Sequence, residues 1–177
     1  AIGGAIPALL ARREQGVVKA IGVGLNNAGA LSRNVREARL DAVMCAGRYS
    51  MRDLGALELL VPAGEEQGTV VVAAGVMNSG LLANPHPDSN YDYAPAPPEI
   101  LRRALAMKDV CERHGVPLRA AALQFVFGHP LVVSAVIGAR KTSHIDDAIV
   151  SMQLQIPSQL WDELRSEGLL PETVPTP

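Results

Sequence analysis

The stretch TVVVAAG, residues 69–75, decides how the rest of the chain is interpreted. Its unbroken apolar run contains three β-branched valines and lies between Gly68 and Gly75. Such a run is typical of a strand in a parallel sheet that is buried on both faces. Three further short apolar runs have the same character, and they cover residues 17–24, 41–46 and 132–137. The sequence therefore predicts four such strands.

Segments with helical periodicity separate these four runs. Apolar residues recur at helical spacing over residues 2–13, 30–39, 54–67, 100–114, 118–127, 143–150 and 158–167. Gly68 is predicted to end the third helix, Pro62 to interrupt or sharply start it, and Ser158 to cap the last helix at its N-terminus. Strands that alternate with helices require a parallel sheet with crossover helices, so the predicted fold class is α/β.

Two architectures of this class are compatible with 177 residues. A (β/α) barrel of eight units needs about 250 residues, so four or five units would leave it incomplete. A doubly wound open sheet fits the length, but no GxGxxG motif follows any of the strands. Residues 84–99 form a proline-rich loop with Tyr91 and Tyr93, and a loop of that length after a strand is our candidate for substrate selection.

Composition excludes several classes of protein. Hydrophobic residues make up 48% of the chain and charged residues 19%, which excludes a disordered chain. The 16 basic and 18 acidic side chains give a net charge of -2, which argues against a nucleic-acid partner. No apolar run reaches the roughly 18 residues of a membrane span, and the N-terminus lacks the basic region and short apolar core of a signal peptide, so we expect a cytoplasmic protein without a membrane partner.

Two further expectations follow from single residues. Cys45 and Cys111 stand apart from any metal-ligand spacing, so we expect two small buried apolar side chains and no metal site. The chain begins with Ala1 rather than Met, inside sequence with helical spacing. This beginning predicts a fragment or a processed product.

Four ordered motifs resemble the second half of an aldo-keto reductase. They are GVVKAIGVGLNN (16–27), RYSMRD (48–53), VVVAAGVMNSGLL (70–82) and AALQFVFGHPLVVSAVIGARKTSHIDDAI (121–149). The aldose and L-fucose dehydrogenase branch of that family is the most similar. The resemblance implies a (β/α)8 TIM barrel, of which residues 1–177 would be one partial domain: the fifth to eighth strands and the C-terminal helix.

The same resemblance implies an oxidoreductase that transfers a hydride between NAD or NADP and a small aldose or another carbonyl compound. In that family a tyrosine exchanges the proton, assisted by an aspartate, a lysine and a histidine on the second to fourth strands. These positions would precede Ala1, so we assign no catalytic residue to the chain and expect it to be inactive alone. Its expected role is to bind the cofactor.

The resemblance also implies which residues contact the cofactor. Asn26, with Asn27 as the neighbouring alternative, matches the amide that holds the nicotinamide carboxamide. The expected set is Asn26, Asn78, Ser79, Gly80, Leu81, Gly138, Ala139, Arg140 and Asp147. His144 stands where NADP-preferring members often have an arginine, which favours NAD slightly.

Several of these residues also have a structural explanation that needs no ligand. Asn pairs and NSG are ordinary turn sequences, and Arg140 with Lys141 can be a solvated helix start.

Two other functions are alternatives to the oxidoreductase. A half barrel would expose two strand edges and one apolar face, so the chain could instead be a non-catalytic module that self-associates to complete a barrel. A weaker alternative is a barrel lyase or isomerase that binds a substrate phosphate near Arg140.

Overall fold

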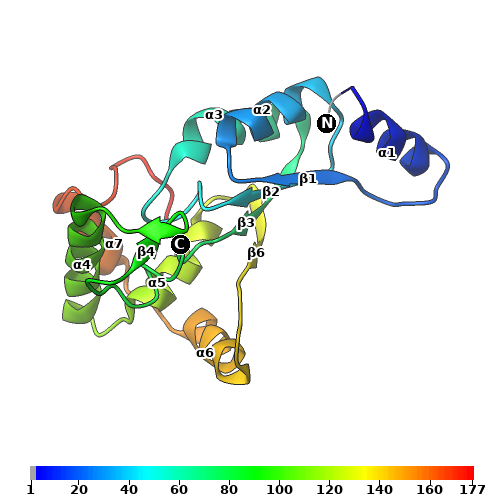
Figure 1. Ribbon diagram of the computed structural model, residues 1–177. Coiled ribbons are helices and arrows are strands. Elements are labelled where there is room, and N and C mark those ends of the chain that lie inside the picture. Colours follow the sequence, from blue (N-terminus) through cyan, green and yellow to red (C-terminus); the bar gives the residue numbers. More distant parts are fainter. Residues whose placement is uncertain (1–2) are drawn as a thin grey trace.

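The computed structural model describes residues 3–177 (Figure 1). Its strands are β1 (Gly22–Leu25), β2 (Ala42–Ala46), β3 (Val70–Ala74), β4 (Asn90–Tyr91), β5 (Ala94–Pro95) and β6 (Val132–Val136). Its α-helices are α1 (Ala5–Glu14), α2 (Ala28–Glu37), α3 (Gly55–Gln67), α4 (Pro98–Arg113), α5 (Leu118–Phe125), α6 (Thr142–Gln153) and α7 (Ser158–Ser166). A short 3-10 helix, η1 (Val126–Gly128), follows α5. None of these helices is long and apolar enough to cross a membrane.

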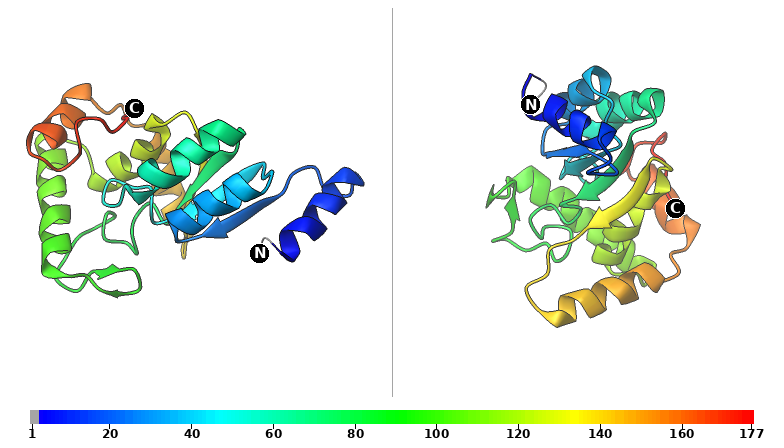
Figure 2. Two further views of the ribbon diagram at one scale, coloured as in Figure 1. Left: turned by 90° about the horizontal axis from the view of Figure 1, so that it is seen from above. Right: turned by 90° about the vertical axis from the view of Figure 1, so that its right-hand side faces the viewer.

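The main sheet has four parallel strands in the order β1-β2-β3-β6. Consecutive strands in this order lie side by side, and helices make the crossovers, as the alternating pattern predicts. The views from above and from the side show α2 and α3 side by side along the sheet, with α6 beyond β6 (Figure 2). The α/β class and the four predicted strands are confirmed.

One face of this sheet carries the core. Val43, Val71 and Val132 lie in one cross-strand row and are at most 5% exposed. Helices α2, α3 and α5 contribute the buried apolar residues Leu31, Leu60 and many others to the same cluster. The core therefore lies between the sheet and its helices.

The opposite face of the sheet is open among the described residues. Met44 is paired with Gly24 on one side and Val72 on the other, and it is 40% exposed. At the sheet edge Val136 is 43% exposed. The expectation that the strands are buried on both faces is therefore wrong for residues 3–177. The alternating burial along β2 shows that a helix layer covers only one side.

Several element boundaries differ from the sequence prediction. The run 17–24 forms a strand only from Gly22, because β2 starts at Ala42 and offers no partner to earlier residues. Pro62 lies inside α3, which continues without interruption through it. Ser158 is the first helical residue of α7 and makes no capping hydrogen bond, so its predicted N-cap role is wrong; the N-cap residue is Pro157.

Other local predictions are confirmed. Gly68 ends α3 in the left-handed conformation with φ +67°. Cys45 and Cys111 are fully buried. The first predicted helix is α1, although Ile2 lies outside the described residues. Within the proline-rich segment, β4 and β5 form a small antiparallel pair that the sequence analysis missed.

A glycine in α3 sets how closely this helix approaches β6. A Cβ atom on Gly64 would lie 2.6 Å from Leu131 Cδ2 and 2.9 Å from the carbonyl oxygen of Thr69. Leu131 directly precedes β6, and Thr69 directly precedes β3. Only glycine, which has no Cβ atom, therefore allows α3 to lie this close to the residues that precede β3 and β6.

We expect Gly64→Ala to lower the free energy of unfolding by about 1–3 kcal/mol, because overpacking outweighs the gain of about 1 kcal/mol in helix propensity. Chemical denaturation of the complete gene product measures the change. Gly29→Ala in α2 is the matched control, since its added Cβ would meet nothing closer than 3.5 Å. Equal effects of the two substitutions would contradict the close approach at Gly64.

Candidate active-site edge

The predicted site residues follow the carboxyl ends of three of the four parallel strands. Asn26 follows β1, Asn78 follows β3, and Gly138 follows β6. Because the strands are parallel, these ends lie along one edge of the sheet. Ligands of parallel α/β folds bind at this edge, so the loops here form the candidate active-site edge.

The structure separates the roles of Asn26 and Asn27. Asn27 is the N-cap residue of α2, and its Oδ1 accepts a hydrogen bond from the backbone amide of Ala30 at 2.8 Å. The side chain of Asn26 makes no hydrogen bond within residues 3–177, although its carbonyl oxygen accepts one from Arg48 Nε at 2.8 Å. Only Asn26 therefore has an amide that is free for a ligand.

Asn78 holds the turn after β3. Its side chain is only 4% exposed, and its Oδ1 accepts a 2.7 Å hydrogen bond from Ser50 Oγ. Its Nδ2 donates to the carbonyl oxygen of Gly47 at 3.4 Å. Asn78 and the next two residues, Ser79 and Gly80, all have positive φ, at 45°, 60° and 93°. The buried amide of Asn78 thus supports the loop.

The other residues of the segment 78–81 are also partly exposed and partly buried. Ser79 and Gly80 are exposed, and open space surrounds the Cα of Gly80. Leu81 is fully buried in the core, so only its backbone could lie near a ligand. The backbone of Ser79 and Gly80 is the part of this segment that a ligand can approach.

The loop after β6 leads into the start of α6. Gly138, Ala139 and Arg140 are exposed, and no atom lies within 4 Å of a Cβ built on Gly138. The backbone amide of Arg140 donates to His144 Nδ1 at 3.3 Å. The N-terminus of a helix and an arginine side chain together favour an anionic group.

Asp147 lies on α6 and is already paired. Both of its carboxylate oxygens accept from Arg119 Nε, at 2.8 and 2.7 Å. The pair is about two-fifths exposed on both sides. Each oxygen retains a further lone pair, so Asp147 can still accept a hydrogen bond from a ligand.

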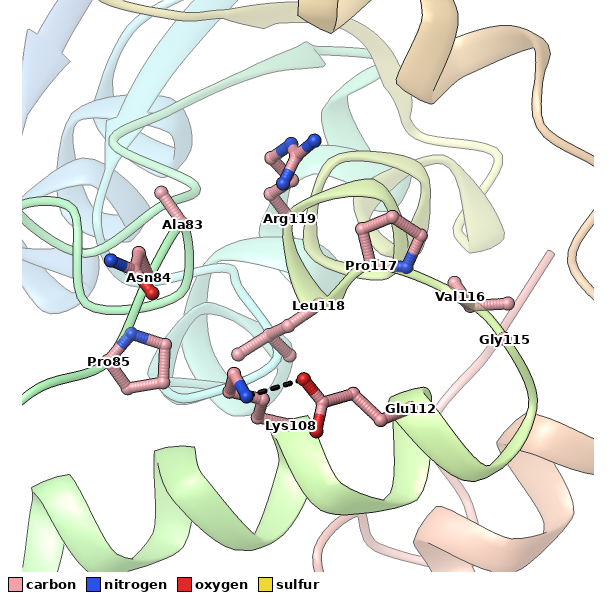
Figure 3. A pocket seen from close by; sticks show the side chains of 10 residues that line it. All are labelled: Ala83, Asn84, Pro85, Lys108, Glu112, Gly115, Val116, Pro117, Leu118 and Arg119. Carbon is pink, nitrogen blue, oxygen red and sulfur yellow. Dashed lines mark hydrogen bonds and ion pairs between the residues drawn. The ribbon is translucent and has the colours of Figure 1, made fainter.

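A cavity of about 320 Å³ lies beside this pair, and Asn84 and Pro85 at the start of the proline-rich loop contribute to its lining (Figure 3). Its lining comes from the segment after β3, from α4 and from the start of α5, and it includes Asn84, Lys108 and Arg119. Lys108 Nζ forms an ion pair with Glu112 at 2.5 Å across its floor. None of the predicted site residues lines this cavity.

Sequence reasoning missed a polar cluster at the same edge. Arg48 follows β2 and forms ion pairs with Asp53, at 2.9 Å, and with Asp92, at 2.6 Å. Tyr91 donates from its hydroxyl to Asp53 Oδ2 at 3.1 Å. The motif RYSMRD contains two members of this cluster, Arg48 and Asp53, but their partners Asp92 and Tyr91 lie about 40 residues later.

The three tyrosines of the chain lie in three different environments. Tyr49 is 1% exposed, and burial raises its pKa to about 12. Burial, followed by the charge of Asp53, raises the pKa of Tyr91. Tyr93 is 95% exposed at the β4–β5 turn. Within residues 3–177 no three potential ligands among His, Cys, Asp and Glu come together to hold a metal ion.

Comparisons with known proteins give the family context. The sequence profile described as "Aldo/keto reductase family" matches residues 4–167. D-threo-aldose 1-dehydrogenase of Pseudomonas sp is 43% identical over 173 residues, which are 97% of this chain and 53% of that protein. Pyridoxal 4-dehydrogenase of Microbacterium luteolum is 40% identical over 169 residues, which are 95% of this chain and 49% of that protein.

A solved structure shares the fold. The apo form of aldo-keto reductase AKR11C1 from Bacillus halodurans superposes with a TM-score of 0.73 at 19% identity, over 96% of this chain and 57% of that chain. The chain thus spans about half the length of the curated relatives it matches.

We expect Asn78→Ala to lower the free energy of unfolding by about 2–4 kcal/mol, because it removes both hydrogen bonds and places alanine in the left-handed conformation. Thermal and chemical denaturation measure this change. Ser79→Ala is the matched control in the same turn, and its exposed side chain should change stability by no more than about 0.5 kcal/mol. Comparable effects of both variants would contradict a supporting role for Asn78.

Proposed function

The chain belongs to the aldo/keto reductase family, and we propose that it is the cofactor-binding part of an NAD(P)-dependent oxidoreductase that acts on a small aldose or another carbonyl compound. The free amide of Asn26 at the active-site edge is the observation that carries this proposal. The names of the two curated relatives, an aldose dehydrogenase and a pyridoxal dehydrogenase, support the substrate class.

The residues at the edge fit a nicotinamide dinucleotide. An amide such as that of Asn26 can donate to and accept from a carboxamide at the same time. Ser79 and Gly80 offer an exposed backbone along which a pyrophosphate can lie. Gly138, Ala139 and Arg140 stand at the start of α6, where a phosphate is favoured. The free lone pairs of Asp147 suit an adenine amino group.

The reaction divides between the cofactor and the protein. The nicotinamide ring, when bound, supplies or accepts the hydride. Residues of this chain bind the cofactor and orient it, and we assign no proton transfer to them. We place the proton-exchanging tyrosine and its aspartate, lysine and histidine partners outside residues 1–177, as the resemblance implies.

We also propose that the four-stranded sheet is the second half of a (β/α)8 barrel. The open face around Met44 and the exposed Val136 at the β6 edge support this arrangement, because a barrel interior is a packed core. The match to about half the length of the relatives agrees with it. The partial domain would then cover residues 1–177, closed by four further strands.

The same open face supports a second candidate, a non-catalytic module in which two copies of the chain complete one barrel. Its uncovered apolar side chains would be buried by the second copy instead. Light scattering on the natural gene product distinguishes the two arrangements. A monomer of about eight (β/α) units favours the single-chain barrel, and a dimer of 177-residue chains favours the module.

Cofactor binding is tested directly by titration calorimetry of the complete gene product with NAD+ and NADP+. We expect both to bind and NAD+ to bind more tightly, because His144 replaces the arginine of NADP-preferring members. Asn26→Ala should raise the Kd for NAD+ about 10-fold through loss of the amide contacts. NAD(P)-dependent oxidation of a panel of aldoses identifies the substrate.

Asn27→Ala is the matched control for this test. It should lower the free energy of unfolding by about 1 kcal/mol through loss of the α2 cap and leave the Kd within about two-fold. Absence of NAD+ and NADP+ binding by the folded wild-type protein would overturn the proposed function. A larger loss of affinity for Asn27→Ala than for Asn26→Ala would reassign the binding amide.

The closed barrel is tested at Met44. If other strands cover this face in the complete gene product, Met44→Lys buries a charge and should lower the free energy of unfolding by about 3 kcal/mol or more. Val17→Lys is the control, because Val17 is 65% exposed in the loop before β1 and should change stability by no more than about 0.5 kcal/mol. A tolerated Met44→Lys would show that the face meets water.

A further inference from the structure

Arg48 connects three loops of the active-site edge. Its Nε donates to the carbonyl oxygen of Asn26 after β1, at 2.8 Å. Its Nη1 donates to Asp53 in the loop after β2, at 2.9 Å, and its Nη2 donates to Asp92 in the β4–β5 turn, at 2.6 Å. The side chain is 22% exposed and uses all three guanidinium nitrogens in these contacts. The planar fork of an arginine can meet three acceptors at once, and a lysine ammonium on a flexible stem cannot reproduce that geometry.

The backbone before Arg48 directs its side chain across the edge. Gly47 has φ +71°, and its amide donates to the carbonyl oxygen of Ala74 at 2.8 Å. A Cβ on Gly75 would lie 3.2 Å from the backbone nitrogen of Gly47. The ends of β2 and β3 are therefore in close contact, which fixes the origin of the Arg48 side chain.

The contact with Asn26 limits how its amide can move. The preceding residue, Leu25, is paired with Cys45 in the sheet, and Arg48 holds the carbonyl oxygen of Asn26 itself. The backbone is thus fixed on both sides of the Asn26 side chain. An amide that rotates on a fixed backbone is preorganised for a ligand, which lowers the entropy cost of binding.

The contact with Asp92 holds the β4–β5 hairpin. This hairpin has only two residue pairs, too few for independent stability. Its turn residues Asp92 and Tyr93 both have positive φ, at 49° and 66°, which costs free energy in residues other than glycine. Two further contacts fix Tyr91, a hydrogen bond to Asp53 and the Arg52 guanidinium at 5.4 Å from the ring centroid.

We propose that Arg48 is a positioning residue that presents the Asn26 amide to the nicotinamide carboxamide and, through Asp92, holds the β4–β5 hairpin against the same edge. The proposal rests on the proposed function for its cofactor part, and the hairpin part stands without it. Arg48 itself touches neither the cofactor nor the substrate in this assignment. It acts through the backbone of Asn26.

The test compares two variants of the complete gene product that break different contacts. Arg48→Met removes the contacts to Asn26, Asp53 and Asp92, whereas Asp92→Gly removes only the contact to the hairpin and suits the positive φ of the turn. Calorimetry gives the Kd for NAD+, and amide hydrogen exchange reports the opening of residues 90–95.

We expect Arg48→Met to raise the Kd for NAD+ about 10-fold and to accelerate exchange in residues 90–95. Asp92→Gly should accelerate the same exchange and leave the Kd within about two-fold. Arg48→Lys should resemble Arg48→Met, because it keeps the charge but loses the fork. In steady-state kinetics the KM for the cofactor should change more than kcat does.

Arg165→Met is the matched control. Arg165 donates to Val174 and Thr176 in the C-terminal segment, away from the edge, so neither readout should change. An unchanged Kd in Arg48→Met, or an equal loss of affinity in Asp92→Gly, would overturn the positioning role. If the wild type binds no NAD+, the proposed function fails. In that case unchanged exchange in both hairpin variants would overturn the remaining part as well.

Discussion

Parallel pairing of β1, β2, β3 and β6 is the constraint on which the rest of the structure depends. A parallel connection must return across the sheet, so each pair of strands needs a crossover, and the helices of these crossovers supply the core. The pairing also brings every strand's carboxyl end to one edge. Residues far apart in sequence, such as Asn26 and Gly138, therefore lie along the same edge of the sheet.

The loops at this edge are fixed by different interactions. Asn27 caps a helix, Asn78 buries its amide beneath a left-handed turn, and Arg48 joins three loops through ion pairs and a backbone contact. In each loop one polar side chain makes the supporting hydrogen bonds, and a residue next to it in the sequence or in space stays exposed. This division explains why Asn26, Ser79 and Gly80 remain accessible next to residues that are not. It also shows why a matched sequence motif mixes residues that support a loop with residues that can bind.

The open face of the sheet is the main difference from an ordinary packed α/β layer. Apolar side chains such as Met44 and Val136 are about two-fifths exposed there, while Val43 and Val71 on the other face are buried. Exposed apolar strands carry an aggregation risk unless something covers them. The family membership and the shared fold of a longer aldo-keto reductase give this face its proposed cover of further strands.

The sequence by itself determined the strand and helix alternation, the four parallel strands, the Gly68 cap and the family. These follow from local periodicity, turn chemistry and ordered motifs, which act over a few residues. Tertiary structure decided which face of the sheet is covered and where the run 17–24 becomes a strand, because both depend on the neighbouring strand. It also decided which of Asn26 and Asn27 caps α2, and it decided the contacts of Arg48. Hydrogen bonds to partners as distant as Asp92 depend on how the loops meet in space, and no local pattern encodes that meeting.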